Sequence, residues 1–322
     1  MSAELFRLAI VGAEDLQARA LTLALKEGGV DATHVIPLGA RLGQLELSLN
    51  DDASADVFLP LERERIQSAQ VVALISRDEE ARSAVARWVE EREILVLDLA
   101  PPPGDAAGWF DPLSSEAEGP VGNLVFPDPA ALYLSKIVGH LGTRIRGPAS
   151  AQIFTPASRM GEAGAVELFG QAATLLNFQP FPKEVLGRQV AFNCWPLPES
   201  ETDYSDFAAQ VRALSRREDL ALSCAPLQGP SFHCTALSTT LVVEDAWEAE
   251  GALRGCLSED HIFGPWDAED WPSPVDVAGQ DRPVVAVRRL DAATLWVWMV
   301  FDNGRAGRGA LAGRWLLGRK TL

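Results

Sequence analysis

The fold is decided by a short stretch near the start of the chain, Leu8-Ala9-Ile10-Val11-Gly12-Ala13. Residues Phe6 to Val11 are apolar except for Arg7, and such a run is typical of a central strand in a parallel sheet. Gly12 ends the run, and Asp15 to Glu27 then alternates apolar and polar residues at helical spacing. The stretch therefore predicts a strand, a turn and a helix.

The same alternation continues through the first third of the chain. Val71 to Ile75 and Ile94 to Leu99 are short runs rich in Val, Ile and Leu, and Glu79 to Arg92 between them has its apolar residues on one helical face. Strands that alternate with crossover helices predict a parallel sheet. Residues 100–122, with three consecutive prolines and scattered acids, predict a loop that approaches a domain boundary.

The pattern changes after Pro129. A helix is predicted over Ala130 to Leu141, and longer segments then follow the two-residue period of strands. Together they predict an antiparallel or mixed sheet with helices on one face. The predicted strands are Ala236 to Val243, Val284 to Leu290 and Thr294 to Phe301, and the predicted helices are Ala163 to Asn177, Asp203 to Ser215 and a final helix, Arg305 to Leu317, that returns to the first domain.

Composition limits the classes of function. The 322 residues fit about two domains, and a net charge of −17 would repel nucleic-acid phosphates and anionic lipid head groups. Apolar runs stay well below the length of roughly 20 residues that spans a bilayer, and the N-terminus lacks the pattern of a signal peptide. We therefore expect a cytoplasmic protein that binds neither nucleic acid nor membranes.

The cysteines give no sign of a metal site. Cys194, Cys224, Cys234 and Cys256 are scattered, without a Cys-x-x-Cys pair. This spacing predicts neither zinc nor a disulfide framework, and buried free thiols are the simpler interpretation.

Motifs in the second half resemble a known family. Trp271 to Asp281 reads WPSPVDVAGQD, Leu295 to Arg305 reads LWVWMVFDNGR, and a small-residue run from Gly307 to Gly313 follows. Their order resembles the end of aspartate-semialdehyde dehydrogenases, and Arg188 to Asn193 is similar to another motif of that family. The closest resemblance is to the catalytically divergent Usg-type paralogues.

The resemblance implies an α/β architecture in two parts. An N-terminal NAD(P)-binding Rossmann-like domain is expected over residues 1–128, completed by a C-terminal helix over 303–322. A mixed α+β domain of the aspartate-semialdehyde dehydrogenase type, over 129–302, is expected to form a homodimer through the open face of its sheet. Large apolar residues on the predicted strands beyond those needed for the core favour such a dimer.

The cofactor turn departs from the family pattern. The family's glycine-rich turn falls on Gly12 to Ala18, where Gly12 and Ala13 are kept but Glu14 and Asp15 replace the residues that face a diphosphate. Carboxylates there oppose NADP, so no cofactor is expected. Alternatively, Glu14 and Asp15 are simply anions that stabilise a helix N-terminus. The other family positions for the cofactor are Ser158, Gly161 and Asn303.

The catalytic positions are also changed. The family's nucleophilic cysteine falls on Pro129, its substrate-binding arginine on Gln228 and its catalytic histidine on Thr235. Pro129 has no nucleophilic atom and predicts a helix start with Asp128 as N-cap. His233 lies two residues before Thr235, on the same face of an extended segment. It is either a displaced catalytic histidine or an ordinary residue of a strand or rim.

Two further positions bear on the substrate pocket. Arg159 and Met160 stand where the family has small residues beside the nicotinamide, and they are expected to fill that space. The family's substrate-binding lysine has no counterpart, because no lysine occurs between Glu184 and Lys320.

Three functions remain open at this point. The first is an interaction or regulatory protein that has lost catalysis and pairs with itself or with a related active subunit. The second is an active NADP-dependent dehydrogenase of amino-acid biosynthesis, and the third is a pocket that binds another small ligand through Asn303, Ser158 and Arg159. The segment from Asp260 to Trp271, rich in tryptophan and acids, is either a partner surface or a loop folded onto its own domain.

Overall fold

The computed structural model describes residues 6–43, 46–49, 55–102, 108–114, 122–198, 204–259, 261–266 and 270–319. The chain divides into two compact units. The first comprises Met1–Pro127 and Gly307–Leu322, and the second comprises Asp128–Ala306. Among the described residues, no helix is long and apolar enough to cross a membrane.

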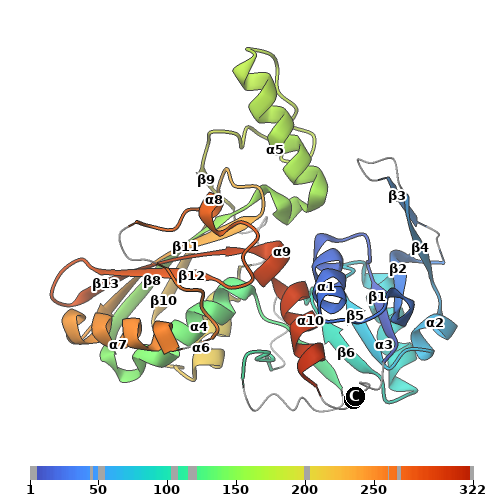
Figure 1. The fold of residues 1–322 in the computed structure, drawn as a ribbon, viewed down its shortest axis with the longest axis horizontal. Coiled ribbons are helices and arrows are strands. Elements are labelled where there is room, and N and C mark those ends of the chain that lie inside the picture. The colour runs from blue at the N-terminus through green and yellow to red at the C-terminus, as the bar shows by residue number, and fades with distance from the viewer. Residues whose placement is uncertain are drawn as a thin grey trace. The chain divides into compact units, whose positions relative to one another are not determined.

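The first unit is built on a mostly parallel sheet with strand order β3-β4-β2-β1-β5-β6-β7 (Figure 1). Continuous burial of β1, β5 and β6 explains their apolar sequences, as predicted. Only β3 at the edge runs antiparallel to its neighbour β4. The strands are β1 (Leu8–Val11), β2 (Val35–Leu42), β3 (Glu46–Leu49), β4 (Ala55–Leu61), β5 (Val71–Leu74), β6 (Leu95–Asp98) and β7 (Asn123–Val125).

Four helices of the first unit, among the residues described, connect or cover these strands: α1 (Leu16–Glu27), α2 (Arg63–Gln67), α3 (Glu79–Glu90) and α10 (Arg308–Gly318). α10 packs closely on α1. A Cβ at Gly309 would lie 2.0 Å from the Gln17 carbonyl oxygen, so only glycine permits this approach. The small-residue run at the end of the chain therefore serves helix packing. The predicted single helix from Arg305 to Leu317 is wrong in one respect: α9 (Asn303–Ala306) and α10 are separated at the extended Gly307.

The second unit contains a mixed sheet with strand order β12-β13-β11-β8-β10-β9. β8 and β10 run parallel, and the other pairs are antiparallel. The strands are β8 (Ile145–Thr155), β9 (Trp195–Pro196), β10 (Leu222–Gln228), β11 (Cys234–Val243), β12 (Val284–Arg289) and β13 (Thr294–Asp302). The α/β fold class with a Rossmann-like sheet and a second, mixed sheet is thus confirmed.

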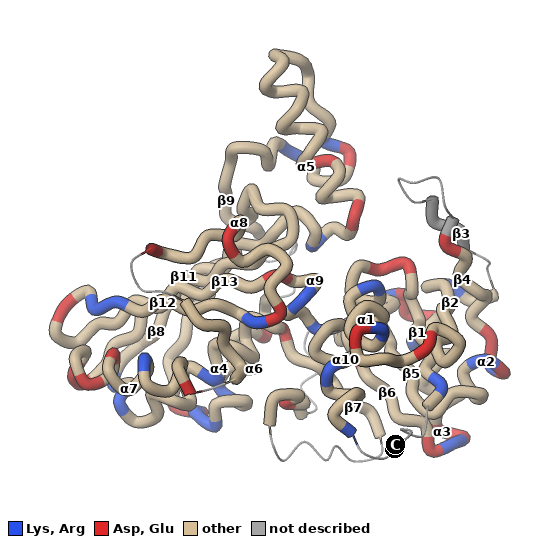
Figure 2. Tube along the Cα trace, in the orientation of Figure 1, with Lys and Arg blue, Asp and Glu red and all other residues tan. Residues whose placement is uncertain are grey.

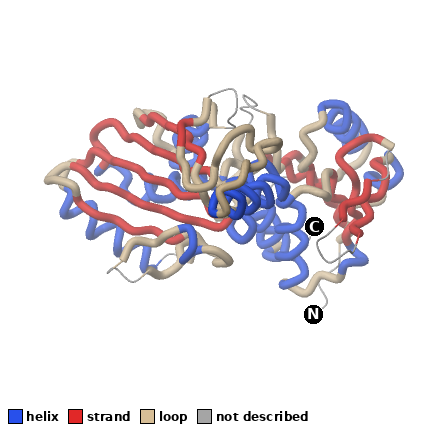
Figure 3. The backbone as a smooth tube through the Cα atoms, turned by 90° about the horizontal axis from the view of Figure 1, so that it is seen from above, coloured by secondary structure: helices blue, strands red, loops and turns tan. Residues whose placement is uncertain are grey.

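One face of the second sheet is covered by helices. α4 (Pro129–Leu141), α6 (Phe207–Ser215) and α7 (Ala246–Glu259) lie along it, and Figure 3 shows them behind the strands. Tyr133 of α4 is buried in this layer, 5.4 Å from the ring of Phe301, and donates a hydrogen bond to the carbonyl of Ala306 at 2.7 Å. α8 (Pro274–Val277) lies against β11 and β13.

The remaining helix, α5 (Gly161–Leu176), rises away from the sheet with the following segment running back beside it (Figure 1). The predicted bounds for this helix were close. For α6 the prediction started too early at Asp203, which lies outside the described residues, while α6 begins at Phe207.

Candidate functional site

The turn after β1 is closed against its neighbours. Gly12 has a φ of +87°, and a Cβ at this position would lie 2.8 Å from the backbone nitrogen of Ser76. The N–H groups of Gly12 and Ala13 donate to the Leu38 carbonyl at 3.1 and 3.0 Å. Gly12 is thus required by strand packing, and its N–H and that of Ala13 are both engaged within the protein.

A carboxylate caps the helix that follows this turn. Asp15 is the N-cap of α1, and its Oδ1 accepts from the Gln17 N–H at 2.7 Å. Burial raises the pKa of Asp15, while the hydrogen bond from the Gln17 N–H and the charge of Arg77 act to lower it. Part of the residue is nevertheless exposed to solvent. Asp15 therefore has the position and the hydrogen bond of a helix N-cap.

A side chain bridges the strands on either side of β1. The Ser76 hydroxyl, just after β5, donates to the carbonyl of Ala40 in β2 at 2.9 Å. Because β1 lies between β2 and β5, this bond spans the carboxyl end of β1, where open α/β sheets bind their ligands. No sequence pattern marked Ser76 for this role.

The next strand end is also occupied by protein groups. Arg82 forms an ion pair with the buried Asp98, and it donates to the carbonyls of Ser76 and Ala100 at 3.2 and 3.0 Å. These bonds neutralise Asp98 and bind the chain after β5 to the chain after β6. In the sequence, Arg82 and Asp98 are distinguished only by their positions after β5 and at the end of β6, two apolar strands.

In the second unit, the position of the family's nucleophile begins a helix. Pro129 is the first residue of α4, and the Asp128 carboxylate accepts from the Ala130 N–H at 2.9 Å. The Asp128 N–H donates to Gln210 at 2.7 Å. The predicted helix start and N-cap are confirmed, and a group able to attack a carbonyl is missing from this position.

Two thiols of the second unit are unsuited to nucleophilic attack. Burial raises the pKa of Cys224 to about 12, and the charge of Asp128 adds to the effect. Burial and the charge of Asp302 likewise raise the pKa of Cys234 to about 12. A thiol of this pKa is protonated at pH 7, whereas reactive cysteines have lowered pKa values.

The buried Gln228 at the family's arginine position is held by several bonds. Its amide nitrogen donates to the carbonyls of Thr155 and Gly229 at 3.1 and 2.9 Å. Its Oε1 accepts from Nε of Arg159 at 3.1 Å. The hydrogen-bonding capacity of this amide is therefore used largely inside the protein.

The position of the family's histidine forms a second polar pair. The buried Thr235 donates from Oγ1 to Oδ1 of Asn303 at 3.1 Å, and the Asn303 N–H donates to the His233 carbonyl at 3.2 Å. The structure thus brings together Thr235, Asn303 and the backbone of His233. The His233 side chain is exposed, in agreement with a rim residue.

The residues at the start of α5 give a mixed result. Ser158 donates its N–H to the Phe232 carbonyl at 3.0 Å, and Gly161 adopts a φ of +76° as the helix begins. Met160 is 43% exposed. Arg159 is also exposed but binds Gln228. Among the described residues, no cluster of His, Cys, Asp and Glu could hold a metal ion.

Comparison with solved structures defines the class of fold. The second and first units together match a probable aspartate-semialdehyde dehydrogenase from Pseudomonas aeruginosa with a TM-score of 0.80 and 24% identity, over 98% of both chains. Aspartate semialdehyde dehydrogenase II of Vibrio cholerae, complexed with ASA, matches with a TM-score of 0.77 and 17% identity over 97% of both chains. The chain therefore has the fold of these dehydrogenases.

Sequence comparison points to the same relatives. The chain is 31% identical over 161 residues to a USG-1 protein homolog of Pseudomonas aeruginosa and 28% identical over 160 residues to aspartate-semialdehyde dehydrogenase 2 of Vibrio cholerae. Each match covers 47% of this chain and 47% of the relative, about half the length of either. No family model matches the chain. These relatives confirm the predicted resemblance to aspartate-semialdehyde dehydrogenases and to their Usg-type paralogues.

Proposed function

We propose that this chain is an aspartate-semialdehyde dehydrogenase homologue that has lost the reaction and acts as a dimeric interaction or regulatory protein. The observation that carries the proposal is the replacement of the nucleophile by Pro129 at the first position of α4. A proline in this position starts a helix well, but it has no group that can form a covalent intermediate.

The bonding around the other family positions supports the same conclusion. Gln228 and Thr235 are buried and hydrogen-bonded to protein partners, so neither offers the charge of an arginine or the proton exchange of a histidine. The described thiols with resolved pKa shifts, including Cys224 and Cys234, have raised values and cannot replace the missing thiolate.

The first unit supports the absence of NADP in this proposal. The backbone N–H groups of Gly12 and Ala13 donate to Leu38, and Asp15 brings a carboxyl to the N-terminus of α1. A diphosphate would have to displace these bonds and approach that carboxyl. We therefore propose that the turn serves the stability of the sheet and binds no dinucleotide.

The partner in this proposal is a second copy of the chain, or a related active subunit, on the face of the second sheet that α4, α6 and α7 leave uncovered (Figure 3). The apolar residues expected on this face are partly covered already, since Trp296 stacks on Trp271 at 4.5 Å and Trp298 donates to Pro272 at 2.6 Å. Small polar side chains occupy much of the rest. Short polar side chains of this kind would allow a second sheet to approach; the polar residues of this face include Ser150, Gln152, Ser223, Ser238 and Thr240.

The decisive test is an assay of the purified protein with aspartate semialdehyde, phosphate and NADP, with the dehydrogenase of Vibrio cholerae as positive control. Loss of the nucleophile from a cooperating site lowers turnover on the order of a millionfold. We expect no reduction of NADP above the buffer rate. Turnover that disappears on His233→Ala substitution would instead favour the displaced-histidine hypothesis and an active enzyme.

A further inference from the structure

One side of α5 is fully engaged within its own chain. Glu167 accepts from the N–H groups of Val185 and Leu186 at 2.7 and 2.8 Å. Gln171, four residues later, donates to the carbonyls of Pro182 and Arg188. These buried side chains bind the returning segment along the inner face of the helix, so this face has no room for another partner.

The opposite side of α5 carries an exposed apolar stripe. Val166, Phe169 and Leu176 are 58%, 68% and 70% exposed, and the exposed Ala173 lies between the last two. The spacing of three, four and three residues places all four side chains along one line of the helix. Side chains of this size are normally buried, and here they lie together on the most outlying helix of the unit (Figure 1).

Charge narrows the choice of partner. The chain carries a net charge of −17, yet the stripe itself contains no charged residue, and Figure 2 shows charged residues of α5 only toward the end where the helix begins. An acidic or basic partner would gain nothing from this surface. A neutral apolar helix would fit it, and a second α5 is such a helix.

The stripe is also complementary to itself. When two copies of α5 lie antiparallel about a two-fold axis near position 171, Val166 faces the Leu176 of the other copy and Phe169 faces its Ala173. The ring of Phe169 then lies over the small Ala173 of the other copy, and the two-fold axis repeats this contact once more. A large side chain over a small one is the packing of knobs into holes. This correspondence follows from the order of residue sizes along the stripe.

We propose that the stripe Val166, Phe169, Ala173 and Leu176 binds the same stripe of a second copy in an antiparallel helix pair. The pair would bury on the order of 1,000 Å² in total, just below the range of about 1,200–2,000 Å² for stable specific interfaces. The α5 contact therefore strengthens a dimer that the second sheet also holds together. This inference rests on the dimer of the proposed function.

A swap of residue sizes tests the pairing without disturbing the monomer, because Phe169 and Ala173 are both exposed. Phe169→Ala leaves a gap opposite Ala173, and Ala173→Phe brings two rings into collision; each should raise the dissociation constant at least tenfold in analytical ultracentrifugation. The double variant Phe169→Ala/Ala173→Phe restores one large and one small residue at each contact. It should therefore recover association close to that of the unmodified chain.

The control is Leu23→Ala, which truncates a 41% exposed residue of α1 in the first unit and should leave association unchanged. Equal association of all three α5 variants and the unmodified chain would overturn the helix pair. If Ser150→Arg on the open sheet dissociates the protein in that case, the sheet dimer of the proposed function stands without it. A monomer at all concentrations would overturn the α5 pair and the sheet dimer together, while loss of catalysis is judged separately by the dehydrogenase assay.

Discussion

Arg159 donates a hydrogen bond to Gln228 across 3.1 Å, and this contact joins the turn before α5 to the end of β10. The family motif would place a substrate-binding arginine at position 228. Here the arginine comes from position 159 and binds the glutamine, so a charge that could hold a substrate anion is partly spent on a structural contact.

Removal of the Gln228 side chain should therefore destabilise the protein. Gln228→Ala removes a donor from the buried carbonyls of Thr155 and Gly229, and Thr155 keeps only the Gly229 N–H at 2.9 Å, so we expect a loss of about 1–3 kcal/mol in the free energy of unfolding. Urea denaturation measures it. Gln179→Ala, at an exposed glutamine, is the matched control and should change stability by less than about 0.5 kcal/mol. Equal stability of the two variants would contradict the structural role of Gln228.

NADP should not bind. A ligand present at a hundred times its dissociation constant adds about 2.7 kcal/mol to stability, which raises the melting temperature by a few degrees. We expect no saturable rise in a thermal-shift titration with NADP up to millimolar concentration. The physical reasons are the Asp15 carboxyl at the start of α1 and the use of the Gly12 and Ala13 donors by Leu38. A clear saturable rise would show that the turn opens for the cofactor.

The thiols should differ sharply in reactivity. Cys194 is exposed, whereas Cys234 is buried and both Cys224 and Cys234 have a pKa raised to about 12. Burial raises the pKa of Cys194 as well, but its thiol is exposed, so labelling with iodoacetamide at pH 7 should modify Cys194 at least tenfold faster than the other two. Mass spectrometry of the labelled peptides measures these rates. Rapid labelling of Cys224, beside the N-terminus of α4, would indicate a relocated nucleophile.

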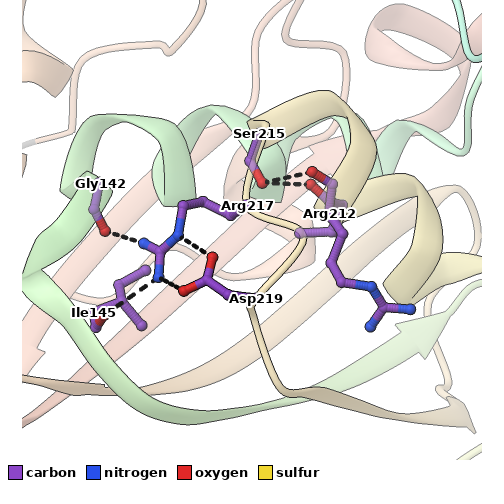
Figure 4. A network of polar contacts seen from close by, with 7 residues as sticks. Gly142, Ile145, Arg212, Ser215, Arg217 and Asp219 are labelled. Atoms are coloured by element: carbon purple, nitrogen blue, oxygen red, sulfur yellow. Dashed lines mark hydrogen bonds and ion pairs between the residues drawn. The ribbon is translucent and has the colours of Figure 1, made fainter.

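The arginine that joins α6 to the start of β8 gives a pH-dependent prediction (Figure 4). Arg217 donates to the carbonyls of Gly142 and Ile145 and to both oxygens of Asp219. The hydrogen bond from Arg217 lowers the pKa of Asp219, so this carboxylate adds stability above its unfolded pKa and loses it as the pH falls through the lower folded value.

Arg217→Ala should destabilise the protein at pH 7, and the part of the loss that belongs to Asp219 should shrink on acidification below the ordinary range of aspartate. Urea denaturation of both forms at pH 7 and pH 3 separates this part from the loss of the two carbonyl contacts, which is independent of pH. Arg212→Ala, at an arginine within α6, is the control. A difference that grew toward low pH would contradict the sign derived from Asp219.

Local patterns predicted part of the fold correctly. The strands β1, β5 and β6 are buried on both faces, so their sequences are continuously apolar and easily recognised. β8 and β10 were missed because they contain glycine, proline and small polar residues that single-strand patterns disfavour. Gly147 in β8 is explained only by its neighbour, since a Cβ there would lie 2.7 Å from the side chain of Val242.

The site was predictable by position but not by contact. Motif comparison placed Pro129, Gln228 and Thr235 at the family's catalytic positions. Their partners lie far away in sequence, as Asn303 does from Thr235, and only the folded sheet brings them within hydrogen-bond distance. Ser76 and Arg82 were missed for the same reason, because nothing local distinguishes them from other polar residues after a strand.

The last prediction concerns the open face of the second sheet. Gln152 on the central strand β8 donates to Ser150 at 3.0 Å, and both side chains are only half-buried. If a second copy covers this face, Ser150→Arg places a charge in a dry interface and should shift the protein from dimer to monomer at micromolar concentration. Thr33→Arg, on the first unit, is the control and should leave the sedimentation coefficient unchanged. If the unmodified chain is a dimer and Ser150→Arg sediments in the same way, the dimer interface does not lie on this sheet. The sheet would then also be ruled out as the surface on which a related active subunit is proposed to bind.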